Sequence, residues 1–478
     1  MTRRPERATI TCACSRRMTR WPGRRRSGWC ASNGVVDERS GQEMTGLEQP
    51  RDRGRRGRSR RAFLAGLAGG ALGGSIGAAL ASAAPPWPVE GGLEITDVRL
   101  VRTKPRNPPP QYEPAPGSYW ATREAARPIM IYPEYTGKRG PDSKWMPDRS
   151  IGPVIVEIST NKGLNGYGRG GHGAGPIVEG NLRKLLVGKN PLEIEKLWDV
   201  MWRATLFYGR AGAAVHAISG ADLALWDLAG KAFGVPVYQL LGGRTWERVP
   251  CYATGNDVEQ SLEFGYKKVK LALQHGPAEG REGLKKNVEH VKRTRELLGP
   301  DGDLMIDCWM ALTETYTLQL AEAVAPYRVH WLEEVLMPDE YEGFGRLNRQ
   351  ITSTLLATGE HEYTRYGFSR LAHYEAVDIW QPEIQYCGGL TELRRIGAMA
   401  LERGIPLIPH AGGFVEPIHY LATMPQLTWA ETTLPAPGGP AEVYRMFEEE
   451  RHISRGPEGV YIQPSEEPGF GWDFEVVG

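Results

Sequence analysis

Short apolar segments alternate with helical stretches through the second half of the chain, and this alternation limits the choice of fold most strongly. The strand candidates are residues 249–254, 267–273, 304–309, 330–335, 355–359, 377–381 and 407–410. Helical stretches at 281–298, 313–325, 368–374 and 390–403 lie between them, and a long helix at 213–233 precedes them. Regular alternation of this kind predicts a parallel sheet, and the number of strands favours a closed α/β barrel over residues 213–440. An open doubly wound sheet is the alternative, although no glycine-rich phosphate loop opens the region.

Residues 84–212 have a different texture and predict a smaller α+β region. Segment 93–100 alternates like a strand, and segment 154–159 forms a second strand candidate that ends in a turn. Helical patterns follow at 177–186 and 191–208. A chain of 478 residues has room for one barrel domain with such an accessory domain.

The first 83 residues differ in charge from the rest and are interpreted as a leader. Residues 1–61 hold 17 arginines, no lysine and 6 acids, a net charge of +11, so residues 62–478 carry 1 − 11 = −10. Such an acidic body argues against a nucleic-acid-binding surface. Ser59-Arg60-Arg61 precedes a weakly apolar, glycine-rich run at 65–83, which predicts a twin-arginine export signal.

This leader predicts that the twin-arginine export machinery carries the protein to the periplasm or the cell exterior. A membrane-anchored form is the alternative if the leader is not cleaved. The signal would begin at Met44, which makes residues 1–43 a candidate for a mis-called start.

Three acidic residues stand at the ends of successive strand candidates. Asp307, Glu333 and Glu360 are separated by 26 and 27 residues, about one βα unit each. In a barrel, this spacing places the three carboxylates side by side at the rim formed by the C-terminal ends of the strands. Buried carboxylates repel one another unless a cation lies between them, and a set of oxygen donors selects Mg²⁺. The spacing therefore predicts a magnesium site.

Longer motifs resemble the mandelate racemase/muconate lactonizing enzyme group of the enolase superfamily. They are Ala217-Ile-Ser-Gly-Ala-Asp-Leu-Ala-Leu-Trp-Asp-Leu-Ala-Gly-Lys231 with the segment 234–243 that follows, Trp331-Leu-Glu-Glu334, and Thr358-Gly-Glu360. The resemblance runs from about residue 93 to the C-terminus. Within the group it is strongest to the L-rhamnonate dehydratases, through segments such as 304–310 and 387–391.

The resemblance implies a (β/α)7β modified TIM barrel at 213–440 and an α+β N-terminal capping domain at 84–212. Residues 441–478 are expected to pack on the cap. It also implies that Mg²⁺ binds to Asp307, Glu333 and Glu360.

The resemblance further implies a lysine or histidine base beside the metal, and only the histidine is retained. The Lys-x-Lys motif of the group is half present, because Lys270 fills the first position and Ala272 the second. Lys270 is expected to contact the substrate carboxylate or the metal-bound oxygen. His410 matches the catalytic histidine of the group. Its partner acid, an Asp in the group, is Glu383 here, and the longer side chain would either orient the imidazole or displace it.

Four more residues are expected to contact the substrate. His361 directly follows Glu360 and matches the rhamnonate dehydratase pattern, in which Trp309 also lies. Tyr119 occupies a cap position where those enzymes carry a histidine, and Arg139 would meet one end of the substrate. A polar rim residue and a solvated loop arginine are the alternatives for His361 and Arg139.

A base on one side of the α-carbon favours dehydration, because racemisation needs a base on each side. We expect a magnesium-dependent sugar-acid (aldonate) dehydratase, a hydro-lyase that removes the α-proton and the β-hydroxyl to give a 2-keto-3-deoxy acid. The alternatives are another enolisation (epimerisation, racemisation or cycloisomerisation) and an exported sugar-acid binder that is catalytically impaired. A homo-oligomer is also expected.

Overall fold

The computed structural model describes residues 92–115, 125–132, 134–135, 149–426 and 428–477. They belong to one compact unit, Ala84–Gly478. The predicted leader and its twin-arginine motif lie outside the described residues. Within the described ranges, no helix combines the length and the apolar character needed to cross a membrane.

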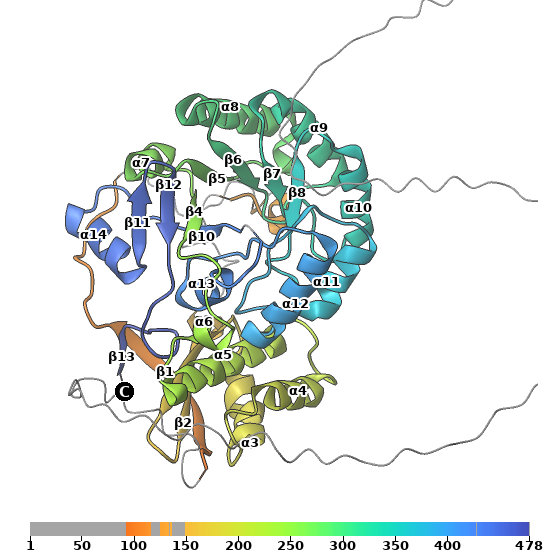
Figure 1. The fold of residues 1–478 in the computed structure, drawn as a ribbon. Coiled ribbons are helices and arrows are strands. Elements are labelled where there is room, and N and C mark those ends of the chain that lie inside the picture. The colour runs from red at the N-terminus through yellow and green to blue at the C-terminus, as the bar shows by residue number, and fades with distance from the viewer. Residues whose placement is uncertain (1–91, 116–124, 133, 136–148, 427, 478) are drawn as a thin grey trace, which may run out of the picture. The chain divides into compact units, whose positions relative to one another are not determined.

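The cap is built on a four-stranded antiparallel sheet in the order β13-β1-β2-β3 (Figure 1). Its strands are β1 (Ile95–Pro105), β2 (Val154–Thr160), β3 (Asn165–Gly170) and β13 (Phe474–Val477). After β3 come α2 (Gly175–Ile177), a π-helical turn (Val178–Leu182), α3 (Arg183–Leu186) and α4 (Ile194–Thr205). The C-terminal strand β13 pairs with β1, which places Val477 opposite Arg102.

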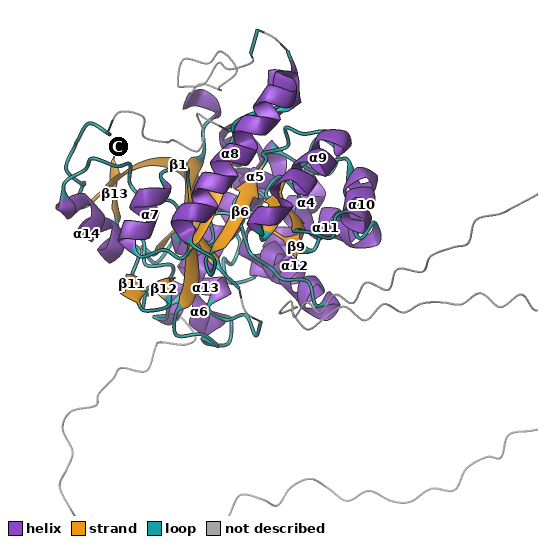
Figure 2. Ribbon diagram, turned by 90° about the horizontal axis from the view of Figure 1, so that it is seen from above, coloured by secondary structure: helices purple, strands orange, loops and turns teal. Residues whose placement is uncertain are grey.

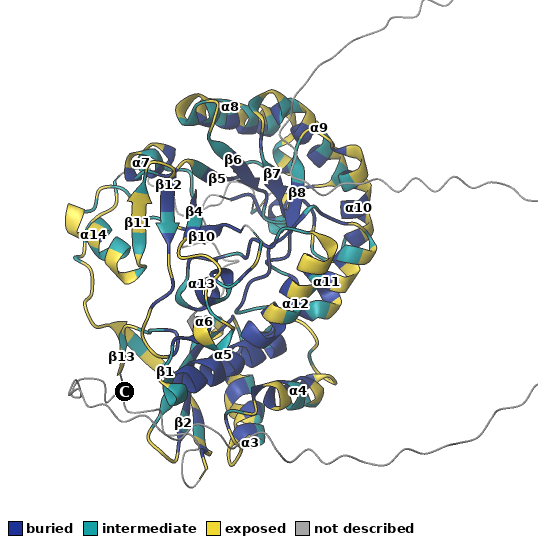
Figure 3. Cartoon of the chain, viewed as in Figure 1, coloured by how far each residue is buried: buried dark blue, intermediate teal, exposed yellow. Residues whose placement is uncertain are grey.

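Helix α5 (Ala213–Phe233) packs directly on β2 and β3 of this sheet. Glycines on β3 allow the close approach, because a Cβ at Gly166 would lie 2.1 Å from the Ala224 oxygen and one at Gly168 would lie 2.3 Å from the Gly220 oxygen. The helix is buried along almost its whole length (Figure 3). This helix was predicted at the start of the barrel region, whereas the strands that it contacts belong to the cap.

Seven short strands form the barrel: β4 (Val249–Thr254), β5 (Lys268–Ala272), β6 (Asp303–Asp307), β7 (Trp331–Glu333), β8 (Leu355–Thr358), β9 (Ile379–Trp380) and β10 (Ala430–Thr432). Strands β4 to β9 pair in parallel in chain order, and β10 pairs in parallel with β4. The predicted strand at 407–410 forms only a bridge from Leu407 to Trp380, and Thr428 Oγ1 donates to the Leu407 oxygen at 2.6 Å. With segment 407–410 as the eighth element, the strands form the expected modified TIM barrel. In the described part of the chain, backbone strand pairing is not continuous between this segment and β10. Strand β10 was not predicted from the sequence.

The barrel helices lie outside the strands (Figures 1 and 2). They are α7 (Val258–Phe264), α8 (Gly280–Leu298), α9 (Glu314–Val324), α10 (Tyr341–Gln350), α11 (Thr364–His373), α12 (Gly389–Arg403) and α13 (Val415–Leu421), and the short α6 (Val237–Leu240) precedes β4. Large side chains fill part of the interior, where the rings of Trp331 and Trp429 lie 5.7 Å apart. The barrel is therefore a packed core, and chemistry is confined to its ends.

The C-terminal segment contacts both parts. Helix α14 (Ala441–Glu450) leads into a hairpin of β11 (Ile453–Gly456) and β12 (Gly459–Ile462). Strand β12 pairs antiparallel with β4 of the barrel, and β13 then joins the cap sheet. The segment expected on the cap thus also extends the barrel sheet.

Candidate active site

The three predicted magnesium ligands lie together at the C-terminal ends of β6, β7 and β8. Asp307 and Glu333 are direct neighbours in the parallel register, and Glu360 follows the end of β8 by two residues. All three side chains are buried. Burial and the charges of Glu333 and Glu360 raise the pKa of Asp307 well above its usual range. Burial also raises the pKa of Glu360 to about 7, although His410 and His361 lie nearby.

The hydrogen bonds of these acids fit the binding of a cation. Glu333 accepts from Lys270 Nζ at 2.6 Å through Oε1, and from Trp331 Nε1 at 3.0 Å and Gln381 Nε2 at 2.6 Å through Oε2. Its Oε1 therefore keeps a free lone pair. Glu360 Oε2 is buried and has no hydrogen-bond partner among the described residues. A Mg²⁺ ion among Asp307, Glu333 and Glu360 would satisfy this oxygen and relieve the repulsion.

A second grouping contains Glu334, Glu360 and His361, whose potential donor atoms all lie within 4.8 Å of one another. His361 Nδ1 lies 2.9 and 3.0 Å from the two oxygens of Glu334, so its Nε2 is turned toward Glu360, 3.9 Å from Oε1. Burial lowers the pKa of His361, but Glu334 and Glu360 raise it to about 9. The grouping includes a nitrogen donor with a raised pKa, so the three-carboxylate set suits Mg²⁺ better.

Lys270 lies at the centre of the acid cluster. Its Nζ is fully buried, 2.6 Å from Glu333 Oε1 and 2.9 Å from Glu431 Oε1. Burial lowers the pKa of Lys270, but these two carboxylates raise it well above its usual range. The lysine is therefore charged, and it can hold a substrate carboxylate but cannot accept a proton. Lys268 is bound elsewhere, 2.6 Å from Asp303.

His410 and Glu383 form a hydrogen-bonded pair. His410 Nδ1 lies 2.7 Å from Glu383 Oε2, while the other oxygen, Oε1, accepts from the Gln385 amide at 2.9 Å. His410 Nε2 then faces the acids, 3.4 Å from Glu360 Oε1 and 3.9 Å from Glu431 Oε2. Burial lowers the pKa of His410, but Glu360, Glu431 and Glu383 raise it well above its usual range. A cation bound to Glu360 would oppose this rise and favour the neutral imidazole, which is the form that accepts a proton. The glutamate that replaces the expected aspartate thus orients the imidazole.

Glu431 on β10 is a site residue that the sequence analysis missed. It pairs with Lys270, accepts from the Ala411 amide at 2.8 Å, and accepts a short hydrogen bond from the Thr254 hydroxyl. Burial raises its pKa, but Lys270 and His410 lower it to about 2. Strand β10 went unpredicted because no helix was predicted between residues 410 and 430, where α13 lies. The available signal was an acid 21 residues after His410, close to one βα unit.

Aromatic rings border the acids. Trp309 meets His361 edge to face, with ring centroids 5.7 Å apart, and the Arg127 guanidinium lies 4.0 Å from the Trp309 centroid. The Tyr386 ring lies 6.3 Å from His361, and burial together with Glu383 and Glu360 raises its pKa, so the phenol is protonated. Arg127 and Tyr386 were not predicted from the sequence as residues of the site.

Two predicted substrate contacts are left without a position. Tyr119 and Arg139 lie outside the described residues.

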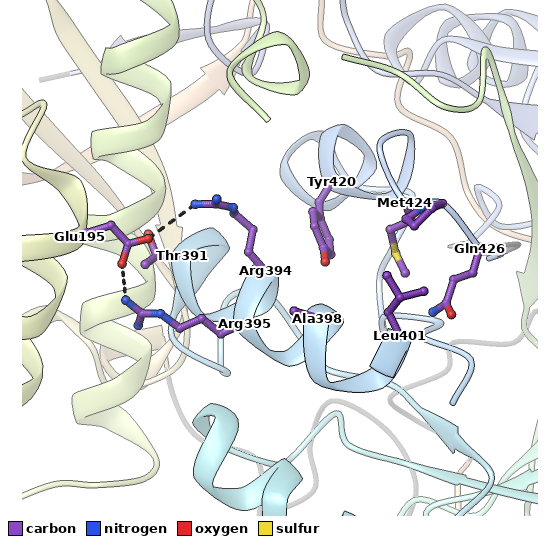
Figure 4. Close-up of a pocket in the computed structure, with 11 residues that line it drawn as sticks. Glu195, Thr391, Arg394, Arg395, Ala398, Leu401, Tyr420, Met424 and Gln426 are labelled. Carbon is purple, nitrogen blue, oxygen red and sulfur yellow. Dashed lines mark hydrogen bonds and ion pairs between the residues drawn. The ribbon is translucent and has the colours of Figure 1, made fainter. Parts of the chain in front are cut away.

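A separate cavity of about 390 Å³ lies among α4, α12 and α13 (Figure 4). None of the acids and histidines of the site lines it. Its two arginines, Arg394 and Arg395, both pair with Glu195. Arg395 also pairs with Glu392, so two carboxylates balance the two arginines and the cavity offers no net charge to a sugar acid.

Two family models match consecutive parts of the chain. Residues 149–242 match the mandelate racemase/muconate lactonizing enzyme N-terminal domain, and residues 253–475 match the enolase C-terminal domain-like family. The L-rhamnonate dehydratase of Saccharopolyspora erythraea is 42% identical over 356 residues, which are 74% of this chain and 90% of that protein.

Solved structures of related enzymes are similar to this chain in sequence and in fold. Rhamnonate dehydratase from Gibberella zeae complexed with Mg is 31% identical to this chain. The two structures superpose with a TM-score of 0.68 over 81% of this chain and 95% of that one. The 3,6-anhydro-D-galactonate cycloisomerase from Zobellia galactanivorans is 31% identical, with a TM-score of 0.58 over 68% of this chain and 91% of that one.

Proposed function

Because the chain belongs to the mandelate racemase/muconate lactonizing enzyme group of the enolase superfamily, we propose that it is a magnesium-dependent sugar-acid dehydratase. Its proposed substrates are sugar acids (aldonates), the class to which the substrate named for the rhamnonate dehydratases belongs. The observation that carries the proposal is the pair of His410 and Glu383, which points Nε2 at the acid cluster from one side.

Asp307, Glu333 and Glu360 would hold the magnesium ion. When bound, it supplies a Lewis acid that stabilises the negative charge developing on the substrate carboxylate. The relative from Gibberella zeae was solved with Mg, which supports this assignment.

The side chains of the protein then perform the proton transfers. His410 takes the C2 proton at Nε2, while Glu383 holds Nδ1–H and stabilises the imidazolium. The imidazolium returns that proton to the C3 hydroxyl as the C3–O bond breaks and water leaves. The resulting enol tautomerises to the 2-keto-3-deoxy acid. Lys270 balances charge at the carboxylate end, and Glu431 fixes Lys270.

Racemisation fits this site less well. Ala272 stands where a second base would be, and the charged Lys270 is already bound by two carboxylates. Cycloisomerisation is the second candidate, since the relative from Zobellia galactanivorans has that activity in its name. The two reactions are distinguished by their products.

The test incubates the full chain with Mg²⁺ and a panel of aldonic acids that includes L-rhamnonate, and measures 2-keto-3-deoxy acid. His410→Asn serves as the control and should lower turnover about 10²- to 10⁴-fold. Solvent-deuterium exchange at C2 is followed in parallel. Neither product nor exchange with any acid would contradict the dehydratase proposal and favour a sugar-acid binder.

We also propose twin-arginine export and a homo-oligomeric state, which rest on the leader motif and on the sequence analysis. Replacing Arg60 and Arg61 with lysine should retain the protein in the cytoplasm of an expressing bacterium, as measured by cell fractionation. Light scattering of the purified protein reads its oligomeric state. Export of the double-lysine variant, or a monomer in solution, would contradict the respective proposal.

A further inference from the structure

Tyr386 lies on the loop after β9, and the residue that orients the base also holds this loop. The backbone amides of Tyr386 and Cys387 donate to the Glu383 oxygen at 2.9 and 2.8 Å. The Gln385 amide donates to the Glu383 carboxylate at 2.9 Å. Tyr386 is therefore fixed relative to the His410–Glu383 pair.

Cap and barrel together hold the Tyr386 ring. On one side lies His216 of α5, with ring centroids 4.5 Å apart, and His361 of the barrel lies at 6.3 Å. The cap backbone also comes close, because a Cβ at Gly171 would lie 2.8 Å from two ring carbons of Tyr386. His216 is itself anchored, with Nδ1 2.8 Å from the His172 oxygen. The ring thus has little freedom to move.

The hydroxyl of this ring has no hydrogen-bond partner among the residues that the structure describes. Tyr386 is only partly buried, so the hydroxyl is not sealed in the core. Tyr341 differs, because its hydroxyl donates to Glu362 Oε2 at 2.5 Å. A fixed ring with an unused donor at the edge of the site has the form of a ligand contact.

We propose that Tyr386 determines specificity by donating a hydrogen bond to a sugar-acid hydroxyl beyond the two reacting carbons. The proposal rests on the proposed function, which places the substrate carboxylate at Lys270 and the acids, and C2 within reach of His410. The Tyr386 ring lies 6.3 Å from that of His361 and 4.5 Å from that of His216 on the cap helix α5, measured between ring centroids. A linear sugar acid would therefore present a distal hydroxyl there.

Calorimetry of the full chain with Mg²⁺ tests this contact. The ligands are the aldonic acid of the panel that binds best and its analogues that each lack one hydroxyl at C4, C5 or C6. Tyr386→Phe should bind the parent acid about tenfold more weakly. One analogue should bind the wild type and Tyr386→Phe equally. In turnover, KM should rise about tenfold while kcat stays within about twofold.

Tyr363→Phe is the matched control, because it removes a hydroxyl from a second tyrosine beside His216, with ring centroids 5.7 Å apart. That hydroxyl already interacts with the backbone of Gly212. Its loss should lower the melting temperature and leave ligand affinity unchanged.

Two results would overturn the proposal. Equal affinity of the wild type and Tyr386→Phe for the parent acid excludes the contact, and equal weakening for every analogue indicates a merely structural role. Product formation without a binding difference refutes only this inference. A binding difference without product refutes only the dehydratase activity. If no acid binds the wild type, both are refuted.

Discussion

Buried carboxylates occur in two regions of this molecule, in helix α5 and at the end of the barrel, and they differ in their partners. Asp227 of α5 accepts from the Phe470 and Tyr167 amides, each at 2.9 Å, and from Lys231 Nζ at 2.6 Å. Glu360 at the barrel end is also buried, yet its Oε2 has no partner among the described residues.

This difference distinguishes a carboxylate that stabilises the fold from carboxylates that can bind a ligand. The partners of Asp227 come from β3, from α5 itself and from the C-terminal segment, so this carboxylate joins three parts of the chain. At the barrel end, the carboxylates face one another and leave acceptor capacity unused. Burial alone therefore does not mark a functional acid, whereas a buried carboxylate oxygen without a donor, such as Glu360 Oε2, does.

The largest expected effect tests the unsatisfied acid. Glu360→Gln should lower turnover at least about a thousandfold, because the metal site loses a charge that it needs. Stability without metal should be unchanged or higher, since repulsion with Asp307 is removed. Magnesium should raise the melting temperature of the wild type and not that of the variant.

The control is Glu362→Gln, two residues away, where the buried carboxylate accepts from Tyr341 and from the Tyr363 amide. It should keep its turnover and its response to magnesium. Normal turnover of Glu360→Gln would remove Glu360 from the metal site.

Asp227→Ala tests the satisfied acid and should cost about 3–5 kcal/mol of unfolding free energy, since it strands a cation and two amides. Turnover per folded molecule should be unchanged. Denaturant unfolding measures the loss.

Asp199→Ala is matched to it, because Asp199 pairs with Arg203 at the same i,i+4 spacing on an exposed helix face. There the loss should be below about 0.5 kcal/mol. Similar losses in both variants would contradict the structural role given to Asp227.

The smallest effect concerns pH. Burial raises the pKa of Asp222 from its ordinary 3.8 to about 7, although Thr391 donates to it through its amide at 2.9 Å and its hydroxyl at 2.6 Å. The folded state therefore binds this proton more tightly than the unfolded state does. Its stabilising contribution is complete below pH 3.8 and is lost as the pH rises toward 7, by at most about 1.4 kcal/mol per pH unit.

Asp222→Asn removes this titration. In urea denaturation, the unfolding free energy of the variant relative to the wild type should increase between about pH 4.5 and about pH 6.5. Both values lie between the ordinary pKa of 3.8 and the raised pKa of about 7. A constant difference would show that Asp222 is ionised throughout.

The barrel acids were predictable because strand spacing and barrel geometry act together. Asp307, Glu333 and Glu360 recur at the length of one βα unit, and parallel strands bring their ends to one rim. His410 and Glu383 came from the resemblance to the group. Glu431 and β10 were missed, because the helix that precedes them, α13, was not predicted and the interval from His410 to Glu431 is only 21 residues.

By itself, the sequence determined the barrel class and the spacing of its acids, since these are local patterns repeated along the chain. Tertiary structure decided that Glu383 reaches His410, that Glu431 holds Lys270, and that Tyr386 is clamped between cap and barrel. These contacts form because the barrel strands are arranged in a ring and because α5 packs against the barrel. Contacts between distant segments depend on the packing of the whole domain, which no local pattern encodes.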